Sequence, residues 1–177
     1  MKVLLTGASG SIGGGCLTQC LAHPGISTVV AFVRRELPTD LSNHPKLKCV
    51  VIKDFSQWPE DVLQAHADAA GMIWAMGSYK GSRTADLEYP LAFLESMARV
   101  LKTKPARPRF KYIHLGGMFT RQDQEKKLYF LEYPRKIRNA MTTYGRRSSS
   151  GQAGRDRGDD RFADGGRDTW GELVRFA

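Results

Sequence analysis

A short apolar stretch followed at once by spaced glycines opens the chain and restricts its fold more than any other feature. Residues 3–14 read VLLTGASGSIGG. Gly7 permits the tight turn out of a strand, Gly10 leaves room for a ligand to approach the backbone, and Gly13 allows the next helix to pack closely. A strand, a glycine turn and a helix in this order are typical of the start of a dinucleotide-binding βαβ unit.

The start of the helix after these glycines predicts an anion site. Its first N–H groups point at the ligand, and the helix dipole favours negative charge there. Ser9 and Ser11 add hydroxyl donors, and Ile12 opens the helix. We therefore expect residues 7–13 to bind the diphosphate of a dinucleotide. Because the spacing is GxxGxxG and not GxGxxG, a glycine-rich turn without a ligand is the alternative.

Apolar stretches alternate with helical patterns along most of the chain. Strands are expected over residues 2–6, 27–33, 47–52, 71–75 and 110–115. Helices are expected over residues 12–22, 59–66, 85–101 and 122–139, with residues 37–46 more loop than helix. This order predicts a doubly wound parallel α/β sheet, the Rossmann fold, with about five strands in the order 3-2-1-4-5 and right-handed crossovers.

The composition predicts one folded domain and a polar tail. The chain has 177 residues, of which 41% are hydrophobic and 25% charged. No apolar stretch approaches the ~20 residues of a membrane span, and the first one ends too early for a signal peptide, so we expect a cytoplasmic protein. Residues 1–140 are expected to form the domain. Residues 141–177 are rich in Gly, Arg, Asp and Ser and are expected to be disordered, although residues 170–176 could dock.

Charge and cysteine content indicate neither nucleic acid nor metal as a partner. The net charge is +9, and part of it lies in the basic run of residues 102–111, whose prolines favour a solvated loop over a nucleic-acid site. An RNA-binding role for the Arg/Gly tail is weakened by its interleaved Asp residues. Cys16 and Cys20 share one face of the first predicted helix with Ile12 and Gln19; buried thiols are favoured over a redox or metal pair.

The end of the second predicted strand bears on the choice of cofactor. A site selective for NAD carries an acid there to accept a hydrogen bond from the ribose, whereas an arginine accommodates the 2′-phosphate of NADP. This chain has Arg34 and Arg35, and Glu36 comes slightly late. Because guanidinium groups match phosphate geometry, we predict NADP(H) over NAD(H), with a pair of solvated arginines as the alternative.

The segment TGASGSIGG, residues 6–14, resembles the cofactor loop of the short-chain dehydrogenase/reductases. The similarity is to the extended and atypical branch that includes nucleoside-diphosphate-sugar epimerase-like proteins, and it covers roughly residues 1–140. The resemblance implies that Asp54 and Phe55 contact the adenine. It also implies that the backbone at Met76 and Gly77 lies beside the cofactor ribose. A helix cap is the alternative role of Asp54.

The resemblance is poor at the catalytic site. Members of the family carry Tyr and Lys at YxxxK spacing and a Ser or Thr at the end of the fifth strand, which together act on a carbonyl or alcohol. Here Tyr133 is followed by Lys136, and the serine position reads Gly116-Gly117, which leaves Thr120 as the nearby hydroxyl. We predict Tyr133, Lys136 and Thr120 as catalytic candidates, with a solvated Tyr and Lys as the alternative.

Two functions follow from this pattern. One is an NADP-dependent oxidoreductase or epimerase-like enzyme that acts on a small molecule. The other is a non-catalytic NADP(H)-binding sensor or interaction protein that lacks the acid–base pair. The family carries a further strand and a substrate-binding region after about residue 140, so one hypothesis is that the tail replaces them through a truncated isoform or an altered gene model. Substrate and oligomeric state cannot be inferred from the sequence.

Overall fold

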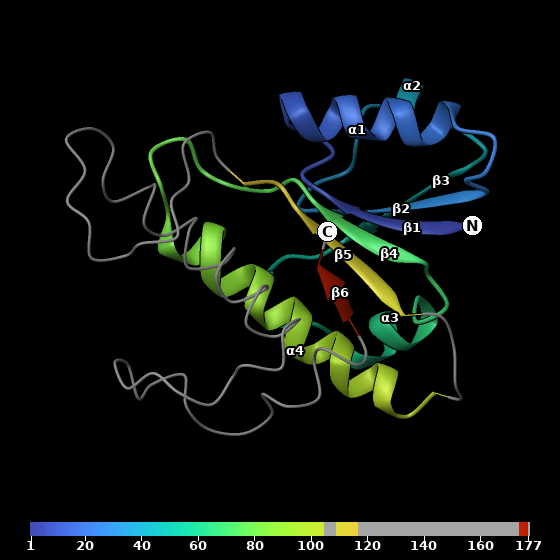
Figure 1. The fold of residues 1–177 in the computed structure, drawn as a ribbon. Helices are drawn as coiled ribbons and strands as arrows, with labels where there is room; N and C mark the ends of the chain where they lie inside the picture. The colour runs from blue at the N-terminus through green and yellow to red at the C-terminus, as the bar shows by residue number, and fades with distance from the viewer. Residues whose placement is uncertain (105–108, 117–173, 177) are drawn as a thin grey trace, which may run out of the picture.

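The structure is a computed structural model that describes residues 1–104, 109–116 and 174–176 (Figure 1). Its centre is a sheet of six parallel strands in the order β3-β2-β1-β4-β5-β6. The strands are β1 (Lys2–Thr6), β2 (Thr28–Val33), β3 (Leu47–Val51), β4 (Gly71–Trp74), β5 (Phe110–His114) and β6 (Val174–Phe176). The first five follow the predicted order, so the doubly wound parallel sheet is confirmed.

Helices cover both faces of this sheet (Figure 1). They are α1 (Ser11–Ala22), α2 (Thr39–Ser42), α3 (Glu60–Ala65), the π-helical turn η1 (Thr84–Glu88) and α4 (Tyr89–Lys102). Helices α1 and α2 lie on one face, and α3 and α4 lie on the other. Among the residues that the structure describes, no helix has both the length and the apolar character needed to cross a membrane.

Alternation along the strands explains why each face has its own core. In β1, Leu5 packs toward α1 and Leu4 packs toward α4, as period-two side chains of a strand buried on both faces must. The core on the α1 side is built mainly from aliphatic residues and Cys20. The core on the α4 side contains most of the buried aromatic rings.

The structure corrects the expected orientation of α1. Its buried residues are Gly13, Leu17, Cys20 and Leu21, whereas the expected face consisted of Ile12, Cys16, Gln19 and Cys20, of which only Cys20 is buried. Ile12 is 59% exposed. The helix is rotated because Gly13, which has no side chain, is the residue that touches the preceding loop.

Two further local differences from the expected structure concern one short helix and the start of another. The segment expected as loop over residues 37–46 contains the one-turn helix α2. The helix expected over residues 85–101 begins with the π-turn η1 and continues as α4, which carries Pro90 in its first turn. Pro90 has no N–H to donate to the preceding turn, and the π-helical turn η1 lies immediately before it.

The tail contributes a strand to the sheet. β6 pairs with β5 in parallel, with Phe110 opposite Val174 and Tyr112 opposite Phe176. Residues 174–176 lie within 170–176, the apolar segment that was expected to dock, and the rest of the tail lies outside the described residues. The helix expected over residues 122–139 lies outside the described residues.

Candidate cofactor site

The turn after β1 depends on a glycine at position 7. Gly7 has φ +77°, in the left-handed region that favours glycine. A Cβ at this position would lie 2.6 Å from the carbonyl oxygen of Ala75 and 2.9 Å from the nitrogen of Met76. The turn therefore lies directly against the backbone that leaves β4, and a side chain of any size would separate the two segments.

Gly13 and Gly10 have different roles in the same turn. A Cβ at Gly13 would lie 1.9 Å from the carbonyl oxygen of Gly7, so the first turn of α1 packs directly on the backbone of the loop. A Cβ at Gly10 would lie 3.3 Å from that same oxygen, and Gly10 is exposed. Gly13 is thus required for packing, while Gly10 keeps the outer surface of the loop open.

The amino end of α1 presents its N–H groups without a cap from the chain. Gly10 occupies the N-cap position, no side chain among the described residues caps the helix, and its first turn contains no acid. Ser9, Ser11 and Ile12 are exposed around this end. Uncapped amides at the positive end of a helix dipole favour an anion. The open loop and the donors therefore fit the diphosphate of a dinucleotide.

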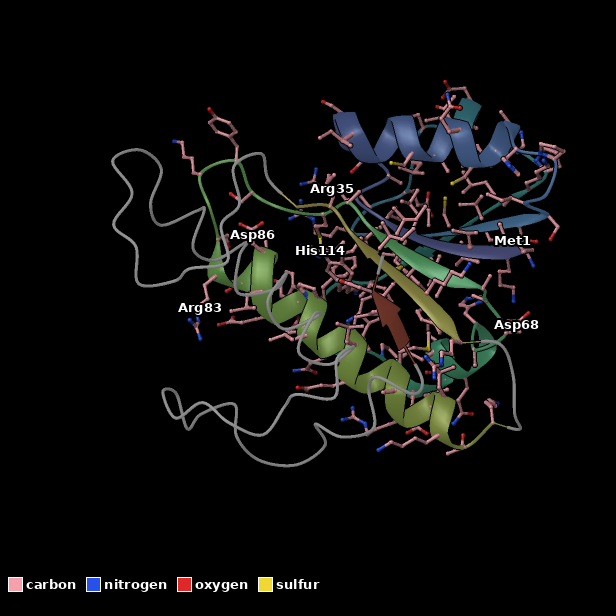
Figure 2. All side chains as sticks on the ribbon, in the orientation of Figure 1. Met1, Arg35, Asp68, Arg83, Asp86 and His114 are labelled. Atoms are coloured by element: carbon pink, nitrogen blue, oxygen red, sulfur yellow. The ribbon has the colours of Figure 1, made fainter. Side chains whose placement is uncertain are left out.

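The two predicted arginines lie at the same edge of the sheet. Arg34 and Arg35 follow β2, which pairs with β1 so that Thr6 is opposite Phe32. Both are exposed, and Figure 2 shows Arg35 at the edge where the parallel strands end. These cations are therefore on the β2 side of the glycine turn.

Asp54 and Phe55 follow the third strand but face different surroundings. Oδ1 of Asp54 accepts hydrogen bonds from the amide of Ser56 at 2.8 Å and from its hydroxyl at 2.7 Å. The bond from the Ser56 hydroxyl is the main reason that the pKa of Asp54 is lowered. The Phe55 ring is 2% exposed and packs against Trp58 and Trp74, so only the backbone of Phe55 can face a ligand.

The segment after β4 lies on the other side of the glycine turn. Met76 is half-buried and Gly77 is exposed. A Cβ at Gly77 would lie 2.8 Å from Oδ1 of Asp86, so a carboxylate occupies the space behind this glycine. The two predicted residues thus border the turn on the side opposite the arginines, because β1 lies between β2 and β4 in the sheet.

Sequence reasoning missed Asp86, a buried carboxylate at this edge. Asp86 is 3% exposed, and it accepts hydrogen bonds from the amides of Ser78 and Ser82, each at 2.8 Å. One signal could have revealed it: Asp86 lies four and eight residues before Pro90 and Leu94, and so shares the apolar face of a predicted helix. An acid on such a face needs a polar partner.

Sequence reasoning also missed His114 at the end of β5. Figure 2 shows it at the same edge as Asp86 and Arg35. Burial lowers the pKa of His114 to about 4, although the negative charge of Asp86 acts in the opposite direction. The imidazole is therefore neutral at pH 7. Its Nδ1 lies 3.4 Å from the hydroxyl of Tyr112, whose pKa is raised by burial.

The three catalytic candidates lie outside the described residues. Tyr133, Lys136 and Thr120 all follow Gly116, the last described residue of that segment. A Cβ at Gly116 would meet no atom within 4 Å among the described residues. The acid–base assignment therefore stays a prediction.

The three cysteines belong to the core on the α1 side. Cys20 is buried there, and Cys16 and Cys49 pack against it while half-exposed. Burial raises the pKa of both Cys20 and Cys49, so these thiols stay protonated at neutral pH. Within the described part of the chain, no cluster of His, Cys, Asp and Glu could hold a metal ion.

A cavity of about 880 Å³ lies at the opposite edge of the sheet, where the strands begin. Val3, Ile73 and Ile113 contribute to its apolar wall, and Asp68 lies at its margin. Figure 2 shows Met1 and Asp68 at this edge, away from Arg35, Asp86 and His114. The cavity is therefore separate from the glycine turn.

Solved structures share this fold. A short-chain dehydrogenase/reductase from Saccharomyces cerevisiae superposes with a TM-score of 0.60 at 12% identity, over 85% of this chain and 64% of its own. Uronate dehydrogenase from Agrobacterium tumefaciens, solved with NAD, superposes with a TM-score of 0.56 at 16% identity, over 85% of this chain and 57% of its own. UDP-glucuronic acid 4-epimerase from Bacillus cereus, also solved with NAD, superposes with a TM-score of 0.56 at 17% identity, over 81% of this chain and 50% of its own.

These matches concern the fold. No family model matches the sequence, and no curated protein is significantly similar to it. The chain spans between half and two thirds of the length of the three proteins described above. It has the Rossmann fold of short-chain dehydrogenase/reductases, which confirms the predicted resemblance at the level of the fold.

Proposed function

We propose that this chain binds NADP(H) across the glycine turn and acts as an oxidoreductase or epimerase-like enzyme on a small molecule. The proposal rests on one observation above all. The α1 helix begins on a glycine at the N-cap, with no capping side chain and no acid in its first turn. Together with the open surface at Gly10, this leaves backbone donors directed at an external anion.

The arginines support NADP over NAD. Arg34 and Arg35 are exposed at the end of β2, the position at which a 2′-phosphate lies in this fold. Uronate dehydrogenase and the 4-epimerase were solved with NAD, so the preference for the phosphorylated cofactor rests on this chain's own side chains. Two guanidinium groups next to a phosphate form charge-assisted hydrogen bonds, which are stronger than neutral ones.

In the proposed enzyme, the cofactor supplies hydride transfer when bound. The residues of this chain would orient it: the amides of residues 10–13 hold the diphosphate, Arg34 holds the 2′-phosphate, and the backbone at Gly77 borders the opposite half. Tyr133, Lys136 and Thr120 are the candidates for moving a proton at the substrate oxygen.

A second candidate function is non-catalytic NADP(H) binding, as in a sensor or interaction protein. It is favoured by Gly116, because the position after β5 that carries a hydroxyl in the resembled family has no side chain here. NADPH oxidation with a panel of carbonyl compounds separates the two functions. Turnover that is lost in Tyr133→Phe supports the enzyme; tight binding without turnover, unchanged in Tyr133→Phe, supports the alternative.

The cofactor site itself is tested by calorimetry with NADPH. Gly10→Val should weaken binding about 100-fold or more, because the side chain fills the space that the diphosphate needs. Folding should change less, since a Cβ there meets only the Gly7 carbonyl oxygen at 3.3 Å. Gly15→Ala, inside α1, is the control, because its Cβ meets no atom of the other described residues within 4 Å. Unchanged affinity in Gly10→Val would place the phosphate elsewhere.

The cofactor preference has a separate test. Arg34→Ala should weaken NADPH about ten-fold and NADH little, because only NADPH carries the phosphate. Equal losses for the two cofactors would reject the role of Arg34 at the 2′-phosphate.

A further inference from the structure

A single buried carboxylate holds the segment that follows β4. Oδ1 of Asp86 accepts the amide of Ser78, and Oδ2 accepts the amide of Ser82, each at 2.8 Å. Between the two serines, the amide of Gly81 donates to the carbonyl of Ser78 at 3.1 Å, and Gly81 has φ +80°. Asp86 thus closes a compact turn through two charge-assisted hydrogen bonds, which are stronger than neutral ones.

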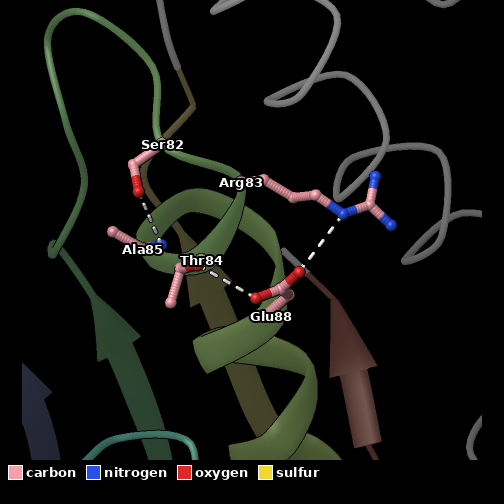
Figure 3. A network of polar contacts seen from close by, with 5 residues as sticks. All are labelled: Ser82, Arg83, Thr84, Ala85 and Glu88. Carbon is pink, nitrogen blue, oxygen red and sulfur yellow. Dashed lines mark hydrogen bonds and ion pairs between the residues drawn. The ribbon is translucent and has the colours of Figure 1, made fainter.

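The π-helical turn η1 carries this carboxylate. The amide of Asp86 donates to the carbonyl of Ser82 at 2.8 Å, which makes the contact between these two residues reciprocal. Figure 3 shows the remaining network: the Ser82 hydroxyl accepts the amide of Ala85, and Glu88 binds both Arg83 and Thr84. Glu88 faces solvent, so its contacts brace the helix start without touching the turn.

The same segment touches the proposed cofactor site on its other side. Gly7 of the glycine turn lies so close to Ala75 and Met76 that a Cβ would lie 2.6 Å from the Ala75 oxygen. Gly77 lies so close to Asp86 that a Cβ would lie 2.8 Å from Oδ1. Residues 75–78 are therefore confined between the diphosphate loop and the Asp86 carboxylate.

We propose that Asp86 is a positioning residue, which fixes residues 76–78 as a preformed wall of the cofactor site. The inference rests on the proposed binding of NADP(H). Since β1 lies between β2 and β4, a dinucleotide whose 2′-phosphate meets Arg34 beside β2 extends toward Gly77 beside β4. A wall that is already ordered before binding removes the cost of ordering it on binding. Asp86 would thus contribute to affinity without touching the cofactor.

Asp86→Asn tests this proposal, with Glu88→Gln as the matched control. An asparagine has the same shape but only one acceptor oxygen, so one of the two amides loses its acceptor. Amide exchange at whichever of Ser78 and Ser82 loses its acceptor should become about ten-fold faster in Asp86→Asn, and exchange at both should stay unchanged in Glu88→Gln. Gly77→Ala is the second variant, because its methyl group displaces the carboxylate while the charge is kept.

Binding of two ligands separates positioning from general destabilisation. At a temperature where each variant is folded by circular dichroism, Asp86→Asn should bind NADPH about ten-fold more weakly, the scale of one lost charge-assisted hydrogen bond. Adenosine 2′,5′-bisphosphate, which reaches only the β2 side, should bind as it does to the unaltered protein. Equal losses for both ligands, unchanged NADPH affinity, or unchanged exchange at both Ser78 and Ser82 would each overturn the proposal.

The failure of the proposed function gives a different result. If the unaltered protein binds neither NADPH nor the bisphosphate, the cofactor site itself is rejected, and the positioning role with it. If the unaltered protein binds both and only the response of Asp86→Asn is absent, the cofactor site stands and Asp86 is only a structural cap.

Discussion

The two faces of the sheet are packed in opposite ways. On the α1 face, backbone packs on backbone: Gly13 contacts the loop at Gly7, and the core between them is made of small and aliphatic side chains. On the α4 face, aromatic rings fill the space. Phe93 alone contacts Trp58, Trp74, Phe110 and Tyr112, with ring centroids 4.9–6.4 Å apart.

This difference accounts for the position of the proposed cofactor site. Helix α1 packs through Gly13 on the loop that follows β1, so its amino end, which no described side chain caps, is held at the edge where β1 ends. The α4 side is filled by aromatic rings, and two polar groups from distant parts of the chain lie at that edge, the buried Asp86 and the half-buried His114. One face therefore supplies backbone donors, and the other supports the segment next to them.

The largest expected effect is on the close packing of the α1 face. Gly13→Ala places a methyl group 1.9 Å from the Gly7 carbonyl oxygen, where backbone must move to accept it. We expect a loss of about 5 kcal/mol in the free energy of unfolding, comparable with the total stability of many domains. Chemical denaturation measures this loss. A stability within about 1 kcal/mol of the unaltered protein would show that α1 does not pack through Gly13.

The next effect compares the two cores directly. Phe93→Ala should lower the free energy of unfolding by about 4 kcal/mol and Leu17→Ala by about 3, because the ring also loses its aromatic contacts. Both side chains are at most 1% exposed, so burial does not distinguish them. Urea titrations of the two variants measure the difference. A larger loss in Leu17→Ala would mean that the aliphatic face carries more of the stability.

A pH titration tests the polar edge of the α4 face. The pKa of His114 is about 4 in the folded protein and 6.5 when unfolded, so the unfolded state binds more protons between these values. The contribution of the neutral His114 to the free energy of unfolding should be fully present above pH 6.5, and the free energy of unfolding should fall by about 3 kcal/mol as the pH drops to 4. His114→Gln should remove this part of the pH dependence, as measured by denaturation from pH 4 to 7. Identical profiles for the two proteins would contradict the burial of a neutral imidazole.

The smallest expected effect has the opposite sign. Gly15 lies within α1, and a Cβ there would meet no atom of the other described residues within 4 Å. Gly15→Ala should therefore raise the free energy of unfolding by about 0.5–1 kcal/mol through helix propensity alone. A rise in melting temperature checks it. A destabilised variant would show that close packing on the α1 face extends beyond Gly13.

The sequence by itself determined the order of elements and the position of the glycine turn. Both depend on local properties: apolar stretches of strand length, glycines at a fixed spacing, and crossovers that have one hand. The strand order and the start of α1 were predictable for this reason. The extra strand β6 was not, because residues 174–176 need the edge of β5 as a partner.

Only the tertiary structure decided which side chains lie inside. It turned α1 so that Leu17 and Leu21 are buried while Ile12 is exposed, since the contact of Gly13 with a loop six residues earlier sets the rotation. It buried the Phe55 ring among aromatic partners and turned Asp86 toward two amides of the preceding turn. Burial of this kind depends on residues that the sheet brings together from distant parts of the chain. The spacing of apolar residues within one helix or strand carries no information about those neighbours.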